Sequence, residues 1–326
     1  DATDALGLTG NRVVDAQGAP FGAFSVSGAR NHLIGLRLRG VGGEDRDVVR
    51  VAGANADGNV LEQLIVDSTA SGDGIGIDDG AGNDFMETAT VVRDCEVRAA
   101  GDKGIKVTTG AFARIERSWV HDNLNGGVQA TLGGHVLAID NLVERNAGIG
   151  GENGFAVQGL EEGDTLSTMT LAGNLVRDNG GNGLSVRAFA AAVVADTAFV
   201  GNGTGGVRVF NDVGGPALAV IEGSALACNA LDGIVVADDS LADLGGGRFA
   251  SAGDNAFAFN GGAGIGFDLR NTSTQEVAAV WSQWTSCGAG VSCDEERVQR
   301  TDVRDLGGGT RISPAVAATG LGAPAV

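Results

Sequence analysis

The chain has 326 residues, of which 56 are glycine, and it carries 41 Asp and Glu against 22 Lys and Arg, a formal net charge of −19. So strong a negative field repels nucleic acids and anionic membranes, and we expect neither as a partner. No apolar run reaches the length of about 18 residues that spans a bilayer, so no membrane-spanning helix is expected. With 43% hydrophobic residues the chain can still bury a core.

The first 60 residues contain strand-like pieces without a clear period. "NHLIGLRLRG" (31–40) and "DVVRVAG" (47–53) alternate apolar and polar residues, which indicates strands. We therefore predict irregular first coils over 1–60, ahead of the more regular sequence that follows.

An acidic, glycine-rich stretch follows at 72–87, "GDGIGIDDGAGNDFME". Its end resembles the calcium-binding nonapeptide of RTX proteins, which form each site from tandem copies. Only one copy occurs here, with Asp79 in place of the first glycine, so we favour a solvated acidic loop. The alternative is a Ca²⁺ site of another kind, because hard cations prefer several oxygen ligands. Its candidate ligands are Asp73, Asp78, Asp79, Asp84 and Asp102.

Glycine-led strand signals recur along the chain. They are "GDGIGID" (72–78), "DKGIKVT" (102–108), "NGGVQAT" (125–131), "ENGFAVQ" (152–158), "GNGLSVR" (181–187), "TGGVRVF" (204–210), "LDGIVVA" (231–237) and "GAGIGFD" (262–268). Their first apolar residues are 23 to 31 positions apart, which is a repeat period. A second short strand ending in Asn, as in "NLVERN" (141–146) and "NLVRDN" (174–179), precedes most of them. We expect these Asn residues to adopt left-handed backbone angles at the corners.

From about residue 271 the period is lost. We predict that 271–326 forms an irregular C-terminal cap and a loosely ordered tail, with Trp281 and Trp284 covering the end of the repeats. Cys287 and Cys293 could close a small disulfide, which would favour an oxidising compartment. Cys95 and Cys228 are interpreted as buried small hydrophobic residues.

The repeat predicts an all-β fold. Each unit is too short for a βαβ crossover, and no helical apolar stripe appears between the strands. Two or three strands per turn, wound the same way, give a right-handed parallel β-helix of about nine or ten coils over 1–270. The pattern resembles the pectin-lyase-like superfamily of parallel β-helix repeats over about 25–270. That superfamily includes polysaccharide lyases, glycoside hydrolases, epimerases, tailspikes and adhesins, so the resemblance implies a fold rather than one function.

Stacked coils place equivalent outward side chains in columns, because side chains alternate faces along a strand. The first column is predicted to contain Gly76, Lys106, Gln129, Ala156, Ser185, Arg208, Val235 and Gly266; the second contains Asp78, Thr108, Thr131, Gln158, Arg187, Phe210, Ala237 and Asp268. The stretch between Lys106 and Arg208 is polar and partly basic. Candidate glycan-binding residues there are Gln129, Thr131, Gln158, Ser185, Arg187 and Phe210.

Two function classes stay open. The first is a secreted or cell-surface β-helix acting as a binding or structural module that faces carbohydrate. The second, implied by the resemblance, is a polysaccharide lyase with Lys106, Lys103 and Arg208 as catalytic residues. A base such as Lys106 must be neutral, and neighbouring carboxylates oppose that. A hydrolase would need clustered carboxylates, which only the neighbourhood of Asp73, Asp78 and Asp102 offers.

Other sequence features add little to function. Ca²⁺ is the one cofactor for which the chain offers residues, and open coil ends could allow end-to-end or lateral self-association. His121 lies beside Asp122, but adjacent strand residues point to opposite faces. We therefore expect a surface histidine without that pairing.

Overall fold

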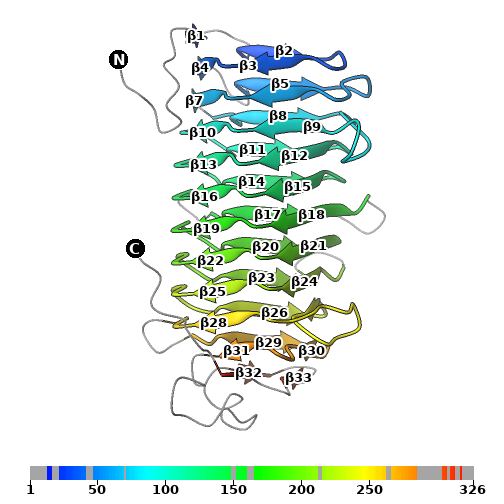
Figure 1. Ribbon diagram of the computed structural model, residues 1–326, viewed down its shortest axis with the longest axis vertical. Coiled ribbons are helices and arrows are strands. Elements are labelled where there is room, and N and C mark those ends of the chain that lie inside the picture. Colours follow the sequence, from blue (N-terminus) through cyan, green and yellow to red (C-terminus); the bar gives the residue numbers. More distant parts are fainter. Residues whose placement is uncertain are drawn as a thin grey trace.

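In this computed structural model the described residues are 13–16, 22–41, 47–69, 71–147, 152–159, 165–211, 215–261, 266–284, 303–306, 309–312 and 316–317. They form an elongated right-handed parallel β-solenoid of strands (Figure 1). The predicted fold class is confirmed. The described part of the chain contains no helix that is long and apolar enough to cross a membrane.

Three parallel sheets run the length of the solenoid. The first sheet consists of β1 (Val13–Asp15), β4 (Arg37–Val41), β7 (Ile65–Thr69), β10 (Glu96–Arg98), β13 (Trp119–His121), β16 (Leu142–Glu144), β19 (Leu175–Arg177), β22 (Ala198–Val200), β25 (Ala225–Ala227), β28 (Ala256–Ala258), β31 (Gln283–Trp284) and β34 (Val316–Ala317). The second sheet consists of β2 (Phe24–Val26), β5 (Val49–Ala52), β8 (Ile75–Asp78), β11 (Ile105–Val107), β14 (Val128–Thr131), β17 (Phe155–Gln158), β20 (Leu184–Arg187), β23 (Val207–Phe210), β26 (Ile234–Asp238), β29 (Leu269–Ser273) and β32 (Val303–Asp305). The third sheet consists of β3 (His32–Ile34), β6 (Val60–Glu62), β9 (Thr90–Arg93), β12 (Phe112–Glu116), β15 (His135–Ile139), β18 (Ser167–Ala172), β21 (Ala190–Ala195), β24 (Leu218–Glu222), β27 (Leu241–Asp243), β30 (Val277–Ala278) and β33 (Thr310–Arg311).

The core is a column of apolar side chains inside the coils. Strand residues alternate between this interior and the outer surface, as in β17, where Phe155 and Val157 are fully buried while Ala156 and Gln158 face outward. Each strand pairs with the strands one coil before and after it, so the backbone hydrogen bonds run along the solenoid axis. This pairing fixes which outward side chains become neighbours.

Asparagine ladders hold the corners between the first and second sheets. Asn146, Asn179 and Asn202 are buried, and the amide of each donates to the side-chain oxygen of the Asn one coil further on, at 3.0 to 3.1 Å. The expected left-handed angles at these Asn residues are wrong. The residue before each one takes that angle, such as Asp178 with φ 53°, because the corner must turn before the amide can point inward.

The sequence predicts a cap for the C-terminal region, but this region continues the three sheets. β29, β30 and β31 pair in parallel with β26, β27 and β28, and β32 to β34 pair with them in turn. Trp284 is fully buried and stacks on Phe257 with ring centroids 4.6 Å apart, so it belongs to the core, while Trp281 is exposed. The division of the chain at residue 270 stays a prediction.

The two cysteines of the repeats differ in environment. Cys95 is buried in the core as a free thiol, and that expectation is confirmed. Cys228 is also free but exposed, so its predicted burial is wrong. It takes a left-handed angle (φ 55°) at a corner, which turns its side chain outward. Cys287 and Cys293 lie outside the described residues.

Candidate functional site

The outward face of the second sheet carries the predicted columns. Lys106 pairs in register with Gln129, Gln129 with Ala156, Ala156 with Ser185 and Ser185 with Arg208. In the second column Thr131, Gln158, Arg187 and Phe210 follow one another in the same way. The predicted register is therefore confirmed from β11 to β23.

The register fails at the last repeat. Ile234 pairs with Leu269 rather than with Ile265, so Arg270, not Gly266, follows Val235 in the first column. Thr272 replaces Asp268 in the second column; Asp268 instead is buried and accepts a hydrogen bond from the Asn260 amide at 2.8 Å. Strand β29 begins at Leu269, whose side chain is fully buried.

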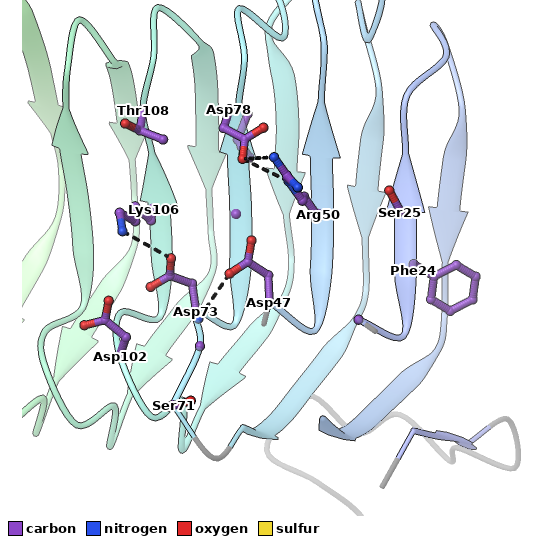
Figure 2. A pocket seen from close by; sticks show the side chains of 14 residues that line it. Phe24, Ser25, Asp47, Arg50, Ser71, Asp73, Asp78, Asp102, Lys106 and Thr108 are labelled. Carbon is purple, nitrogen blue, oxygen red and sulfur yellow. Dashed lines mark hydrogen bonds and ion pairs between the residues drawn. The ribbon is translucent and has the colours of Figure 1, made fainter. Parts of the chain in front are cut away.

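The larger hollow on this face is a cleft of about 510 Å³, here named the aspartate cleft. It lies over β2, β5, β8 and β11, and Figure 2 shows its charged side chains on neighbouring strands. The residues that line it are Gly22, Phe24, Ser25, Asp47, Arg50, Ser71, Gly72, Asp73, Gly76, Ile77, Asp78, Asp102, Lys106 and Thr108.

Asp47 and Asp73 form the centre of the aspartate cleft. Asp47 Oδ1 accepts a hydrogen bond from the backbone N–H of Asp73 at 3.3 Å, and Asp73 Oδ1 accepts one from the N–H of Lys103 at 2.9 Å. Gly76 permits this arrangement, because a Cβ at that position would overlap the Asp47 carboxylate. Glycine in the first column thus makes room for an acidic side chain from the preceding coil.

Burial in this cleft favours the protonated forms of Asp73 and Asp47. Asp73 is 6% exposed, and burial raises its pKa to about 7, with the nearby Asp47 carboxylate adding to the rise and Lys106 opposing it. Burial likewise raises the pKa of Asp47, against the opposing hydrogen bond from Asp73. The site therefore holds a carboxyl group that can exchange a proton near neutral pH.

The cations of the aspartate cleft are paired with its carboxylates. Lys106 Nζ lies 3.8 Å from Asp73 Oδ2, and Arg50 Nη2 lies 2.9 Å from Asp78 Oδ2 and 3.2 Å from Asp79 Oδ2. Burial raises the pKa of Asp78 despite its hydrogen bond with Arg50.

The candidate calcium ligands are divided among several partners. Asp102 bonds to Lys103 at 2.8 Å, and Asp84, exposed in the 79–87 loop, accepts a hydrogen bond from the N–H of Met86 at 2.6 Å. Within the described ranges no three carboxylate, imidazole or thiol groups converge so as to hold one metal ion. Calcium binding stays a prediction and enters no step below.

A second hollow of about 300 Å³, here named the arginine cleft, adjoins the first along the same face. It lies over β14, β17, β20 and β23 and includes most of the predicted binding residues. The residues that line it are Lys103, Asn125, Gly126, Val128, Gln129, Glu152, Asn153, Ala156, Val157, Gln158, Asn182, Ser185, Arg187, Arg208 and Phe210. Thr131 is buried and lines neither cleft.

The predicted catalytic residues are not brought together. Lys106 lies in the aspartate cleft, whereas Arg208 lies in the arginine cleft, four strands further along the sheet. Lys103 lines the arginine cleft but bonds to Asp102 of the aspartate cleft. Sequence reasoning missed Asp47 and Arg50, because the sequence over 1–60 shows no clear period. Asp47 could have been found only by noticing that Gly76 leaves an empty place in the first column.

His121 contradicts the expected surface histidine. Its side chain is buried, with Nδ1 2.5 Å from Asp122 Oδ2 and Nε2 3.2 Å from Glu96 Oε1, and its ring stacks on Trp119. The pairing with Asp122 forms because Asp122 takes a left-handed angle (φ 53°). That angle ends the strand alternation and returns the carboxylate to the same face. This cluster lies on the first sheet, away from both clefts.

Comparison with known proteins places the chain in a fold family. Residues 48–219, more than half of the chain, match the family described as "Right handed beta helix region". The chain therefore belongs to this right-handed β-helix family.

Two solved structures are similar over most of the chain. The pectate lyase Pel9A is 13% identical, with a TM-score of 0.47, and the match covers 89% of this chain and 71% of that one. The A-module of the mannuronan C-5 epimerase AlgE4 of Azotobacter vinelandii is 14% identical, with a TM-score of 0.41, covering 94% and 88%. At these values neither similarity supports an inference about activity. A search of curated proteins finds no match.

Proposed function

We propose that this protein binds a linear polysaccharide along the outward face of the second sheet. The observation that carries the proposal is the continuity of the aspartate and arginine clefts, which adjoin at the β11 coil and together extend from β2 to β23. An extended polymer can lie across successive strands and contact one set of side chains per coil. A polysaccharide ligand also implies a secreted or cell-surface location, as the composition led us to expect.

The polar groups of the arginine cleft suit a hydroxyl-rich ligand. The side-chain amides of Gln129 and Gln158 and the hydroxyl of Ser185 have no hydrogen-bond partner among the residues that the structure describes. Ligand pockets fix orientation through a few such uncommitted donors and acceptors. Ring hydroxyls of sugars both donate and accept, so they can satisfy all three side chains.

The proposal is tested by affinity electrophoresis in gels that contain dextran, xylan, gellan, alginate or pectate. We expect at least one polymer to retard the wild-type protein. Replacing Gln129 and Gln158 together by Ala should weaken that binding about thirtyfold, because each lost neutral hydrogen bond contributes about 1 kcal/mol. Gln275→Ala, between β29 and β30 and outside both clefts, is the matched control. Unretarded migration in every gel would refute the proposal.

Asp73 and Asp47 favour a second candidate function, hydrolysis of a glycosidic bond in the aspartate cleft. A protonated carboxylic acid near neutral pH can donate its proton to the leaving oxygen while a second carboxylate takes one from the attacking water. Asp73, with its pKa near 7, suits the first role, and Asp47 is its neighbour for the second. Elimination by Lys106 is disfavoured, since Asp73 stabilises the charged ammonium.

Product analysis decides between binding alone and cleavage. Each retained polymer is incubated with the protein and examined for new reducing ends and for the absorbance of unsaturated sugars. Hydrolysis predicts reducing ends without unsaturated product, and Asp73→Asn should abolish them while leaving binding in the gel intact. Unsaturated product would instead support a lyase. A polymer that is bound but unchanged would leave the protein as a binding module.

A further inference from the structure

The two clefts of the second sheet carry opposite charge. Four carboxylates and two cations line the aspartate cleft, whereas Lys103, Arg187 and Arg208 face a single carboxylate, Glu152, in the arginine cleft. Four strand steps separate Lys106 from Arg208, roughly 19 Å at about 4.8 Å per step. That exceeds the screening length of about 8 Å at physiological salt, so each cleft acts on a ligand mainly through its own charges.

Arg208 offers a guanidinium group to a ligand. Its side chain is placed over the Phe210 ring, with Cζ 4.1 Å from the ring centroid, and no carboxylate in the described part of the chain pairs with it. The ring fixes the plane of the guanidinium and leaves its N–H donors for an acceptor in the cleft. A planar fork of this kind binds a carboxylate or sulfate through two parallel hydrogen bonds.

Ser185 supplies a second, independent indication of a ligand. It pairs in register with Arg208 and is only 7% exposed, yet its hydroxyl has no hydrogen-bond partner within the described residues. The hydroxyl oxygen keeps some contact with solvent and lines the arginine cleft, so a ligand can reach it. A ligand oxygen held by Arg208 would provide the missing partner.

The aspartate cleft offers no comparable place for an anion. Arg50 is engaged by Asp78 and Asp79, and Lys106 is engaged by Asp73. An anionic sugar there would lie beside the carboxyl group of Asp47, and the ion pair of Asp102 with Lys103 leaves that cation engaged as well. Like-charge contacts of this kind oppose binding, so this half of the face favours neutral sugars.

From these observations, and resting on the proposed polysaccharide binding, we infer that the ligand is an acidic heteropolysaccharide whose anionic sugars are separated by neutral ones. One carboxylate or sulfate group binds Arg208 and Ser185 in the arginine cleft. Neutral sugars of the same chain occupy the aspartate cleft. Arg208 is then the residue that determines specificity for the anionic group, and a polymer charged at every sugar fits less well.

Calorimetric titration with matched oligosaccharides tests the inference. The probes are gellan fragments, whose uronates are separated by neutral sugars; κ-carrageenan fragments, in which sulfated and neutral sugars alternate; oligogalacturonate, charged at every sugar; and neutral dextran fragments. We expect gellan or carrageenan fragments to bind at least tenfold more tightly than either of the other two. Whichever of the pair binds better identifies the anionic group as carboxylate or sulfate.

Two variants locate the effect. Arg208→Gln should weaken binding of the preferred fragment about tenfold or more, and weaken dextran binding far less, since the charge-assisted hydrogen bond that is lost forms only with the anionic group. Arg248→Gln is the matched control, because Arg248 also lies over a phenylalanine, Phe249, at 4.7 Å but outside both clefts. Above about pH 8, where the carboxyl group of Asp73 is ionised, Asp73→Asn should strengthen oligogalacturonate binding severalfold by removing a repelling charge.

Several outcomes overturn the inference. Oligogalacturonate binding as tightly as the preferred fragment would exclude charge segregation, and Arg208→Gln with unchanged affinity would exclude the role of Arg208. In both cases the polysaccharide-binding proposal survives. The proposed function itself fails if the wild-type protein, shown to be folded by a cooperative melting curve, binds none of the four probes and no polymer in the gels.

Discussion

Asp73 differs from the other acidic residues of the aspartate cleft in how little water its carboxyl group contacts. Desolvation penalises the ionised form, and the neighbouring Asp47 carboxylate adds to that penalty. Lys106 offsets part of it from 3.8 Å. The result is a buried acid that changes charge near neutral pH, which an exposed aspartate does not do. A single residue therefore links the charge of the aspartate cleft to pH.

The raised pKa of Asp73 has a consequence for stability. The folded-state pKa of about 7 lies above the usual 3.8, so the folded protein binds the proton more tightly than the unfolded chain does. This contribution to stability is complete below about pH 4 and is lost as pH rises to about 7. Asp73→Asn mimics the neutral form and does not titrate. As pH rises from about 4 to 7, the free energy of unfolding of the wild type should therefore fall relative to that of the variant, by as much as about 4 kcal/mol. Urea denaturation of both proteins from pH 4 to 8 measures it; parallel pH curves would contradict the assignment.

At the scale of the element, the corners rather than the strands fix the register of each coil. The strands are short, three to six residues in most cases, and a one-residue slip would turn every inward side chain outward. The buried Asn ladder prevents such a slip, because each side-chain amide donates to the Asn side chain one coil further on and to a backbone carbonyl one coil before. The repeated Asn therefore fixes the strand register at each turn of the solenoid where it occurs.

Removing one step of the ladder should destabilise the solenoid strongly. Asn179 donates to the Val143 carbonyl at 3.1 Å and to Asn202 at 3.1 Å, and it accepts from the Asn146 amide at 3.0 Å. Asn179→Ala leaves these buried groups unpaired, so we expect a loss of about 3 kcal/mol in the free energy of unfolding. Asn83→Ala, in the exposed 79–87 loop, should cost well under 1 kcal/mol. Urea midpoints compare the two; equal effects would mean that the ladder adds no special stability.

At the scale of the whole molecule, the electrostatic field of the net charge and the local charges of the arginine cleft act on an anionic ligand in opposite directions. The net charge of −19 repels an anionic polymer at a distance, whereas the arginine cleft attracts it at contact. The long-range repulsion is screened by salt, while the short-range contact with Arg208 is screened less. Approach and final affinity should therefore respond differently to ionic strength.

Stopped-flow measurements of gellan-fragment association check this opposition. The screening length falls from about 30 Å at 0.01 M to about 8 Å at 0.15 M salt, so the association rate should rise severalfold over that range. The rate for neutral dextran fragments should not change. An association rate for the anionic fragment that falls steadily from the lowest salt would show that the local cations dominate even at long range.

The sequence by itself determined the repeat and hence the fold. The spacing of Ile105, Val128 and Phe155 set the coil length, and their regular recurrence was enough to place Lys106, Gln129 and Ser185 in one outward column. This worked because each coil contacts mainly its neighbours, so local pattern and tertiary contact coincide. Where the pattern was interrupted, at Gly266 and Asp268, the prediction failed.

Only the tertiary structure decided which side chains form the clefts and how they are charged. Asp47 lies just before β5, where the sequence shows no clear period, and its carboxylate occupies the place that a side chain at Gly76 would need. Asp122 reaches His121 because a left-handed angle breaks the strand alternation. Burial and side-chain packing depend on how coils stack in three dimensions, so the raised pKa of Asp73 and the placement of the Arg208 guanidinium over the Phe210 ring could not be read from spacing alone.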